Sequence, residues 1–212
     1  MRVLRLVGAG LGGYLLGTFP SADVAARVAS DGRIDLRDYG SRNPGAMNAL
    51  HQLGRGYGLA VAGADVAKGA VACVLGRRLA GPDGSHLAGV AAVAGHCYPV
   101  WSGFRGGGKG VATSAGQCLA TFPAYVPLDT AIGILTAAYM PHGRRALTAT
   151  VATSSAWIAG SVLWWRKRLP NGWGPEPTAA LPLASLATTA VIMSRFAAAL
   201  RAHEVDDLGE HW

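Results

Sequence analysis

One short segment of the sequence has the residue types and the spacing of a phosphate-binding loop. It reads FRGGGKGVAT over residues 104–113, between two apolar runs, and its glycines and lysine are Gly106, Gly107, Gly108, Lys109 and Gly110. Glycine lets backbone N–H groups come close to a ligand, and successive N–H groups form a concave anion site. A helix that begins behind them adds a positive dipole. The segment therefore predicts a phosphate site at a membrane surface, although a flexible basic loop between two membrane helices would have a similar composition.

The nucleotide-binding P-loop is excluded by the residue that follows the lysine. Gly103 to Lys109 fits the spacing G-x-x-x-x-G-K, but Gly110 stands where the P-loop has the Ser or Thr that binds magnesium. The preceding residues also lack the pattern of a strand in a βαβ unit. We therefore expect this loop to bind phosphate without hydrolysing a nucleotide.

A second polar segment, YGSRNPGAMN at residues 39–48, has the composition of a turn. Its hydrogen-bonding side chains are Ser41, Arg42, Asn43 and Asn48. The segment fits either a plain surface turn or a binding site for a polyhydroxy phosphate. His96 ends an apolar run shortly before Lys109, so it is either an interfacial histidine or a part of the same site.

Two ionisable residues lie inside an apolar run, Gly58–Leu79. Asp65 and Lys68 are three positions apart and share one helix face, so they can pair. Ionisable groups at membrane depth are costly and face the protein interior or a polar cavity. The pair either locks helices together or borders the site.

The composition is that of a membrane protein. Of the 212 residues, half are apolar and 15% are charged, against about 25% charged in a typical soluble domain. The net charge of +7 suits anionic lipid headgroups or anionic substrates, and no nucleic-acid motif is present. Cys73, Cys97 and Cys118 have no metal-binding spacing, so we expect buried free thiols and no metal or cofactor.

The apolar runs predict an all-α polytopic membrane helix bundle that forms one domain over residues 1–212. About seven spans are expected, at residues 3–19, 58–79, 87–101, 110–122, 124–140, 146–165 and 179–200. Residues 110–122 are short for a span and suggest a tilted or re-entrant segment. Ala, Gly, Ser and Thr dominate the runs, which permits close helix packing in lipid.

The distribution of Lys and Arg predicts the orientation of the bundle. If the polar loop from Ala22 to Arg55 is cytoplasmic, more basic residues lie inside than outside. Arg2 and Arg5, next to the first run, favour the opposite orientation. In the predicted orientation Ser41, His96 and Lys109 all lie on the cytoplasmic face.

Several motifs occur in an order that is similar to one known family. They are GTFPS at residues 17–21, GSRNPGAMN at 40–48, DVAKG at 65–69, GHCYPV at 95–100 and FRGGGKGVAT at 104–113. Together they resemble the bacterial acyl-phosphate-dependent glycerol-3-phosphate acyltransferases. The motifs cover about the first half of the chain. The resemblance implies a seven-span inner-membrane enzyme that moves a fatty acyl group from acyl phosphate to the 1-hydroxyl of glycerol 3-phosphate.

The resemblance also assigns roles to residues. It implies that His96, Lys109 and Ser41 are catalytic, without a metal. The implied substrate-binding residues are Arg42, Asn43, Asn48, His51, Gly106, Gly107, Gly108 and Gly110. The implied partners are acyl phosphate, glycerol 3-phosphate and membrane lipid, and we expect a monomer. The base that takes the hydroxyl proton is either His96 or a substrate phosphate.

The sequence departs from the family pattern at several positions. His51 stands where the family has an arginine, and Arg42 and Met47 replace Gly and Thr. The family's R-H-x-x-N near the last helix reads RFAAA at residues 195–199. Thr148, Thr150, Ser154 and Ser155 are the candidates to replace a family serine. Two other functions stay open: a non-catalytic relative that binds an anionic lipid or phosphate metabolite, and a small transporter.

Overall fold

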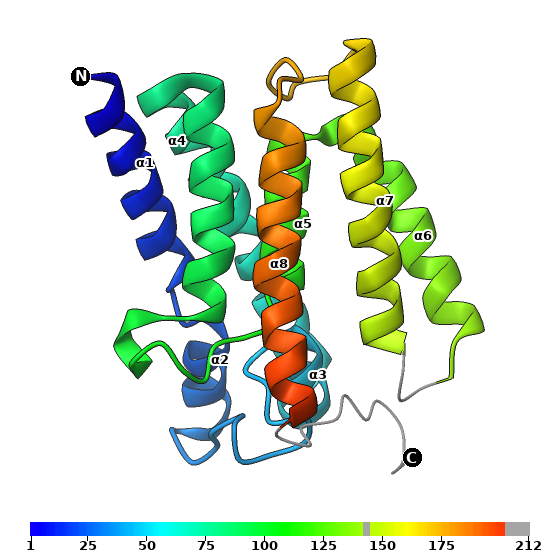
Figure 1. The fold of residues 1–212 in the computed structure, drawn as a ribbon. Helices are drawn as coiled ribbons and strands as arrows, with labels where there is room; N and C mark the ends of the chain where they lie inside the picture. Colours follow the sequence, from blue (N-terminus) through cyan, green and yellow to red (C-terminus); the bar gives the residue numbers. More distant parts are fainter. Residues whose placement is uncertain (142–144, 202–212) are drawn as a thin grey trace.

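The structure is a computed structural model that describes residues 1–141 and 145–201. Long helices run side by side in a bundle, and short helices lie at one end of it (Figure 1). The helices are α1 (Arg2–Gly17), α2 (Ser21–Ser30), α3 (Ala46–Leu53), α4 (Arg55–Cys97), α5 (Val111–Thr121), α6 (Val126–Tyr139), α7 (Arg145–Lys167) and α8 (Ala180–Arg201), with 3-10 turns at Val100–Ser102 and Pro123–Tyr125.

Helix α4 turns back on itself at Ala80 and Gly81. Both residues leave helical geometry, with φ of −136° and 70°, and Pro82 suits the first turn of the arm that follows. Lys68 lies 2.7 Å from His96, although 28 residues of straight helix would span about 42 Å. The element is therefore two antiparallel arms, joined by a tight turn at Ala80 and Gly81.

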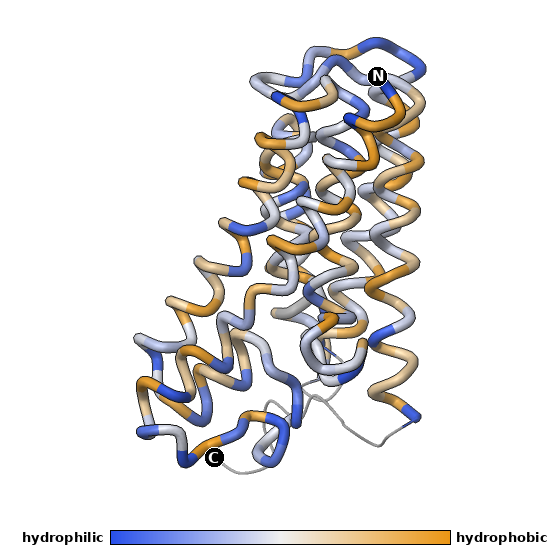
Figure 2. The backbone as a smooth tube through the Cα atoms, turned by 90° about the vertical axis from the view of Figure 1, so that its left-hand side faces the viewer, coloured by the Kyte–Doolittle hydropathy of each residue, from blue (hydrophilic) through white to orange (hydrophobic). Residues whose placement is uncertain are grey.

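Within the described residues, four helical stretches are long and apolar enough to cross a membrane, at Arg2–Ser30, Arg55–Ser102, Arg145–Lys167 and Ala180–Arg201. A fifth would be the pair Val111–Thr121 and Pro123–Thr136, which is bent by 113°. Hydrophobic positions follow the helices, and hydrophilic ones concentrate towards the two ends (Figure 2). The all-helical, multi-pass membrane class is confirmed, and the number of about seven spans stays a prediction.

Small residues bring the helix backbones into contact, as the sequence predicted. A Cβ atom on Gly17 of α1 would collide with the backbone of Ala92 in the second arm of α4. A Cβ on Gly116 of α5 would collide with the backbone of Val66 in the first arm. Such contacts let van der Waals packing stabilise helices that already lie in lipid, and they fix α4 between α1 and α5.

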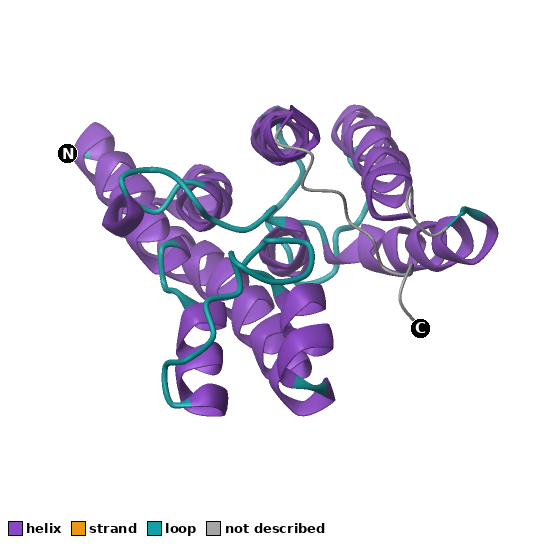
Figure 3. Cartoon of the chain, turned by 90° about the horizontal axis from the view of Figure 1, so that it is seen from below, coloured by secondary structure: helices purple, strands orange, loops and turns teal. Residues whose placement is uncertain are grey.

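The short helices α2 and α3 cover the end of the bundle opposite the N-terminus (Figure 1). Leu36 is fully buried in an apolar cluster with Ala26, Ala49 and Val61, which joins both short helices to the first arm of α4. Viewed along the bundle from this end, the connecting loops lie between the helix ends (Figure 3). The segment between α4 and α5 reaches the same end, so the two polar motifs meet there.

Candidate active site

A cavity of about 430 Å3 opens at this end of the bundle, and we call it the motif cavity. The predicted site residues that line it are Ser41, Asn43, Asn48, His51, His96, Lys109 and Gly110. They come from the loop before α3, from α3, from the second arm of α4 and from the segment before α5. The fold thus brings together motifs that are far apart in the sequence.

The N-terminus of α5 faces the motif cavity. The helix begins at Val111, directly after Gly110, and no side chain caps it. Gly110, Val111 and Ala112 all line the cavity, next to Lys109. The first N–H groups of a helix have no intrahelical acceptor, and the helix dipole makes this end positive. Lys109, Gly110 and a helix N-terminus therefore meet at this cavity, whereas Gly106, Gly107 and Gly108 are not among its lining residues. The N–H of Gly108 donates to the carbonyl of His96 at 3.2 Å, and phosphate binding by the loop stays a prediction.

The four glycines of this loop serve two different purposes. Gly106 and Gly110 have φ of 64° and 85°, which side chains disfavour. Gly107 and Gly108 are needed for close packing instead. A Cβ on Gly107 would collide with the backbone of His96, and a Cβ on Gly108 would collide with the His96 ring. The loop therefore lies directly on the end of α4.

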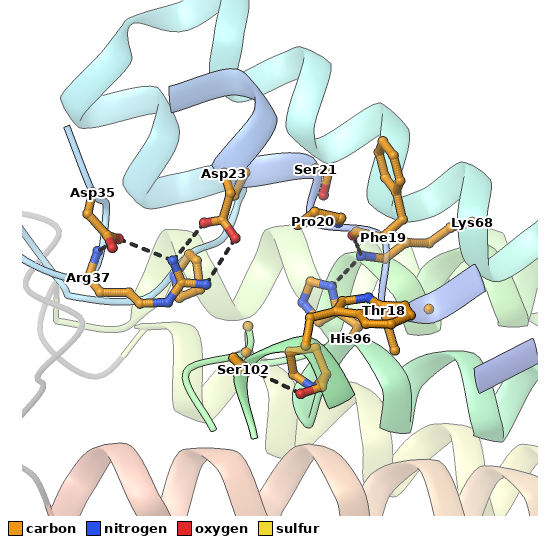
Figure 4. A pocket seen from close by; sticks show the side chains of 17 residues that line it. Thr18, Phe19, Pro20, Ser21, Asp23, Asp35, Arg37, Lys68, His96 and Ser102 are labelled. Atoms are coloured by element: carbon orange, nitrogen blue, oxygen red, sulfur yellow. Dashed lines mark hydrogen bonds and ion pairs between the residues drawn. The ribbon is translucent and has the colours of Figure 1, made fainter. Parts of the chain in front are cut away.

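The predicted pair of Asp65 and Lys68 forms at 2.8 Å, with side chains that are 2% and 6% exposed. The ammonium group of Lys68 also donates to the carbonyl of Phe19, at 3.2 Å. Its third contact is His96 Nδ1, at 2.7 Å (Figure 4). The Ser21 hydroxyl donates to Asp65 Oδ1 at 2.5 Å. The pair joins the first residues of α2 to both arms of α4, and it borders the site.

These contacts determine the proton position on His96. A lysine ammonium group can only donate hydrogen bonds, so Nδ1 of His96 is the acceptor and the proton of the neutral ring lies on Nε2. Nε2 is the side-chain atom nearest to where a Cβ of Gly108 would lie. His96 thus presents a hydrogen-bond donor towards the glycine loop.

Asn48 lines the motif cavity, but its amide group holds the neighbouring loop. Nδ2 donates to the carbonyls of Leu36 and Tyr39, at 2.8 and 3.0 Å. Oδ1 accepts the backbone N–H of Ser41 at 3.3 Å. Both amide protons are therefore engaged, and the side chain positions Ser41. A direct contact between Asn48 and substrate stays a prediction.

Arg42 is placed differently from the other predicted site residues. Its side chain is exposed, it is not among the residues that line the motif cavity, and its φ is 54°. His51, in the last turn of α3, does line the cavity. A cation supplied by Arg42 in place of the family's arginine finds no support in this geometry.

A second cavity, of about 460 Å3, is also lined by His96, and we call it the Arg37 cavity (Figure 4). Gly107 and Gly108 line it, together with Lys68. Sequence analysis did not single out Arg37, because no local pattern connects it to the glycine loop 69 residues away. A chain-wide contact of this kind becomes visible only in the fold.

The guanidinium group of Arg37 pairs with Asp23 at 2.7 and 3.1 Å and with Asp35 at 3.1 Å. The backbone N–H of Arg37, which donates to Asp35 Oδ1 at 2.9 Å, is the main cause that lowers the pKa of Asp35, and the guanidinium group adds to it. Asp35 is therefore charged at neutral pH. Together, Asp23 and Asp35 fix the guanidinium group in the lining of the cavity.

The C-terminal half supplies the apolar wall of the motif cavity. Phe196 lines it, and Lys109 Nζ lies 5.0 Å from the centroid of its ring. Thr150 is the one candidate among the four predicted Ser and Thr residues that lines the cavity. Its hydroxyl donates to the carbonyl of Ala146 at 2.7 Å, and its second lone pair can still accept a hydrogen bond.

Comparisons with known proteins identify the family of the chain. The sequence model of the glycerol-3-phosphate acyltransferase family matches residues 7–202. The glycerol-3-phosphate acyltransferase of Synechococcus sp. is 39% identical over 173 residues, which is 74% of this chain and 84% of that protein. The one from Paramagnetospirillum magneticum is 49% identical over 118 residues, 56% of this chain and 57% of that protein.

A solved structure has the same fold along nearly the whole chain. It is the glycerol 3-phosphate form of PlsY, an integral membrane glycerol 3-phosphate acyltransferase, with a TM-score of 0.74 and 25% identity. The match covers 96% of each chain. The resemblance seen in the motifs is confirmed over both halves of the sequence, and the chain belongs to the glycerol-3-phosphate acyltransferase family.

Proposed function

We propose that this protein transfers a fatty acyl group from acyl phosphate to the 1-hydroxyl of glycerol 3-phosphate. The hydroxyl oxygen attacks the acyl carbonyl carbon, an ester C–O bond forms, and the C–O bond to phosphate breaks. The products are lysophosphatidic acid and inorganic phosphate. Acyl phosphate is already activated, so the protein mainly has to align two anionic substrates and neutralise their charge.

One observation carries this proposal: the motif cavity combines an uncapped helix N-terminus, Lys109 and Ser41. The first two favour an anion by dipole and by charge. Ser41 and Asn43 add hydrogen-bonding groups for the glycerol part. The apolar residues on the other side, among them Phe196 and Ala149, suit the start of an acyl chain.

The proton of the attacking hydroxyl goes to a phosphate oxygen in this proposal. His96 has its Nδ1 occupied by Lys68, and its Nε2 carries the ring proton. That atom therefore donates a hydrogen bond to a substrate oxygen rather than removing a proton. A phosphate group has a second pKa of about 6, so a dianionic phosphate is a competent acceptor near neutral pH.

The proposal includes the placement of the protein in the membrane. The two arms of α4, together with α1, α5, α6, α7 and α8, would give about seven crossings of the inner membrane by a monomer. The motif cavity would then face the cytoplasm, where the basic residues of its end of the bundle satisfy the positive-inside rule. Cysteine labelling at positions 41 and 109, in a background without the three native cysteines, tests this, and opposite sidedness of the two positions would contradict it.

The activity is tested with purified protein in lipid nanodiscs, given acyl phosphate and labelled glycerol 3-phosphate. We expect lysophosphatidic acid and inorganic phosphate in equal amounts, and no product with Lys109→Ala. The absence of product from the wild-type protein, under conditions in which a related acyltransferase is active, would contradict the proposal.

A non-catalytic relative is the second candidate, and the position of Phe196 is the observation that favours it. This ring takes the place of a hydrogen-bonding histidine of the family pattern beside Lys109. Such a protein would bind glycerol 3-phosphate through Lys109 without turnover. Calorimetric binding of glycerol 3-phosphate without any product would support this candidate over the enzyme.

A further inference from the structure

Two arginines hold three consecutive carbonyl groups of the glycine loop. Arg37 Nε donates to the carbonyl of Gly106 at 3.0 Å. Arg195, which follows the loop in the sequence whereas Arg37 precedes it, donates to the carbonyls of Gly107 and Gly108, at 2.6 and 3.4 Å. The first arginine lies between α2 and α3 and the second on α8, so the loop is held from both sides.

Each guanidinium group is also held in place by residues outside the glycine loop. Arg37 makes a two-pronged contact with Asp23 at 2.7 and 3.1 Å (Figure 4). Arg195 lies over the ring of Tyr98, at 5.6 Å from its centroid, and the Tyr98 hydroxyl meets Ser194 at 2.6 Å. A planar guanidinium group offers several donors in a fixed fork, so one group can bind its anchor and the loop at the same time.

The electrostatic consequence concerns the direction of the peptide dipoles. Carbonyl oxygens carry partial negative charge and would repel a phosphate, whereas N–H groups and a helix N-terminus attract it. Carbonyls that point at guanidinium groups are neutralised and cannot turn towards the cavity. The same loop then continues into Lys109 and the uncapped start of α5, which do line the motif cavity.

We propose that Arg37 and Arg195 are positioning residues, which clamp the carbonyls of Gly106, Gly107 and Gly108 so that the positive end of α5 and Lys109 face the substrate phosphate. This inference rests on the proposed function for the identity of the substrate, but the clamp itself is a property of the fold. Neither arginine needs to touch the substrate.

The first test measures how strongly the glycine loop is held, by hydrogen exchange, and does not depend on enzyme activity. Deuterium uptake by peptides that cover residues 103–110 is compared between wild type, Arg37→Gln and Asp23→Asn, in nanodiscs. Asp23→Asn keeps Arg37 but weakens its anchor. We expect at least about fivefold faster uptake in the loop in both variants, with uptake in α7 unchanged. Arg33→Gln is the matched control, because that exposed arginine makes its contacts away from the glycine loop, with the exposed Asp31 at 3.8 Å and the carbonyl of Ser30 at 2.9 Å.

The second test separates positioning from general stability. We expect Arg37→Gln to raise the KM for glycerol 3-phosphate or acyl phosphate about tenfold, with kcat within threefold of wild type. In Arg37→Lys, the KM should lie between those of wild type and Arg37→Gln. Arg195→Gln should behave alike, and the double variant should lose less than the product of the single effects, because either change already frees the loop.

The outcomes distinguish the clamp from the proposed function. Faster loop uptake in Arg37→Gln, in a protein that shows no acyl transfer, would support the clamp and contradict the activity. Unchanged loop uptake, or a fall in melting temperature with KM and kcat altered equally and no rescue by lysine, would overturn the clamp.

Discussion

The ammonium nitrogen of Lys109 lies 5.0 Å from the centroid of the Phe196 ring. The family pattern has a histidine at this position of α8, and the ring of Phe196 cannot replace its hydrogen bonds. The negative face of an aromatic ring does attract a cation, by about 0.5–2 kcal/mol. Phe196 therefore restrains Lys109 by a cation–π contact and keeps its charge beside the motif cavity.

Phe196→Leu should weaken substrate binding while it preserves the apolar wall. Loss of the ring removes the attraction that restrains Lys109, so we expect the KM for glycerol 3-phosphate to rise about 3- to 10-fold, with kcat little changed. Steady-state kinetics in nanodiscs measure it. The control is Phe122→Leu, the same change in an apolar cluster away from the cavity. It should lower the melting temperature and leave the KM unchanged. An equal rise in KM in both variants would refute the cation–π role of Phe196.

Lys109→Ala should abolish measurable acyl transfer while the protein stays folded. The side chain is only half-buried, so its removal opens no large cavity in the core of the bundle. A charge-assisted hydrogen bond to phosphate contributes about 1.5–3 kcal/mol, so glycerol 3-phosphate affinity should fall roughly 10- to 100-fold. Calorimetry measures the affinity, with the exposed neighbour Arg105→Ala as the control. Wild-type affinity in Lys109→Ala would end the phosphate-loop interpretation.

Local sequence patterns predicted the helices well, because each depends on nearby residues. The apolar runs, the break at Pro123 and the helix that begins after Gly110 are all present. The pairing of Asp65 with Lys68 was predictable for the same reason, since residues three apart share a helix face. The motifs of the loop before α3 and of the glycine loop predicted which segments form the cavity.

Contacts that depend on the folded chain could not be predicted in this way. Lys68 meets His96 only because α4 turns back at Gly81, and this contact decides which nitrogen of the histidine donates. Arg37 meets Gly106 across 69 residues. Asn48 has the side chain of a substrate-binding residue, yet its amide protons go to Leu36 and Tyr39, because buried carbonyls need donors.

His51→Arg should strengthen substrate binding. His51 lines the motif cavity at a position where the family pattern has an arginine, and a guanidinium group can bind phosphate with two parallel hydrogen bonds. We expect the KM for glycerol 3-phosphate to fall about 10-fold or more, from a charged hydrogen bond of about 1.5–3 kcal/mol. His51→Gln, which adds no charge, is the control. No change in KM or in calorimetric affinity would show that the substrate phosphate does not reach α3.

Asp65→Asn should destabilise the bundle strongly. It leaves the ammonium group of Lys68, which is 6% exposed, without its counter-charge, and such a loss typically costs about 3–5 kcal/mol. Thermal unfolding in detergent should show a clearly lower melting temperature. The exposed Asp31→Asn, which loses only a surface contact with Arg33 at 3.8 Å, should have no measurable effect.

A double variant, Asp65→Asn with Lys68→Met, separates lost charge balance from lost packing. Because the uncompensated ammonium group is gone, the double variant should melt at a higher temperature than Asp65→Asn alone. Its activity should stay low, since His96 Nδ1 has lost the donor that fixes its proton on Nε2. Equal melting temperatures for Asp65→Asn and Asp31→Asn would contradict the stabilising role of the buried pair.

Arg42→Gly should stabilise the protein without changing substrate binding. Arg42 has a φ of 54°, a left-handed conformation that costs a residue with a Cβ roughly 1–2 kcal/mol. Glycine removes this cost, but it also increases the conformational entropy of the unfolded chain, which lowers the free energy of unfolding by about 0.4–1 kcal/mol. The net gain should be about 0.5–1 kcal/mol, seen as a higher melting temperature. Arg33→Gly is the control. Arg33 is not among the residues with positive φ, so glycine at this position should lower the melting temperature.

The same variant tests whether Arg42 replaces the cation that His51 cannot supply. The Arg42 side chain is exposed and is not part of the lining of the motif cavity, so the KM for glycerol 3-phosphate should stay within twofold of wild type. A charged contact with phosphate would instead contribute about 1.5–3 kcal/mol, and its loss would raise KM by 10-fold or more. A higher melting temperature with an unchanged KM assigns Arg42 to the turn alone; a 10-fold rise in KM would place its guanidinium group on the substrate.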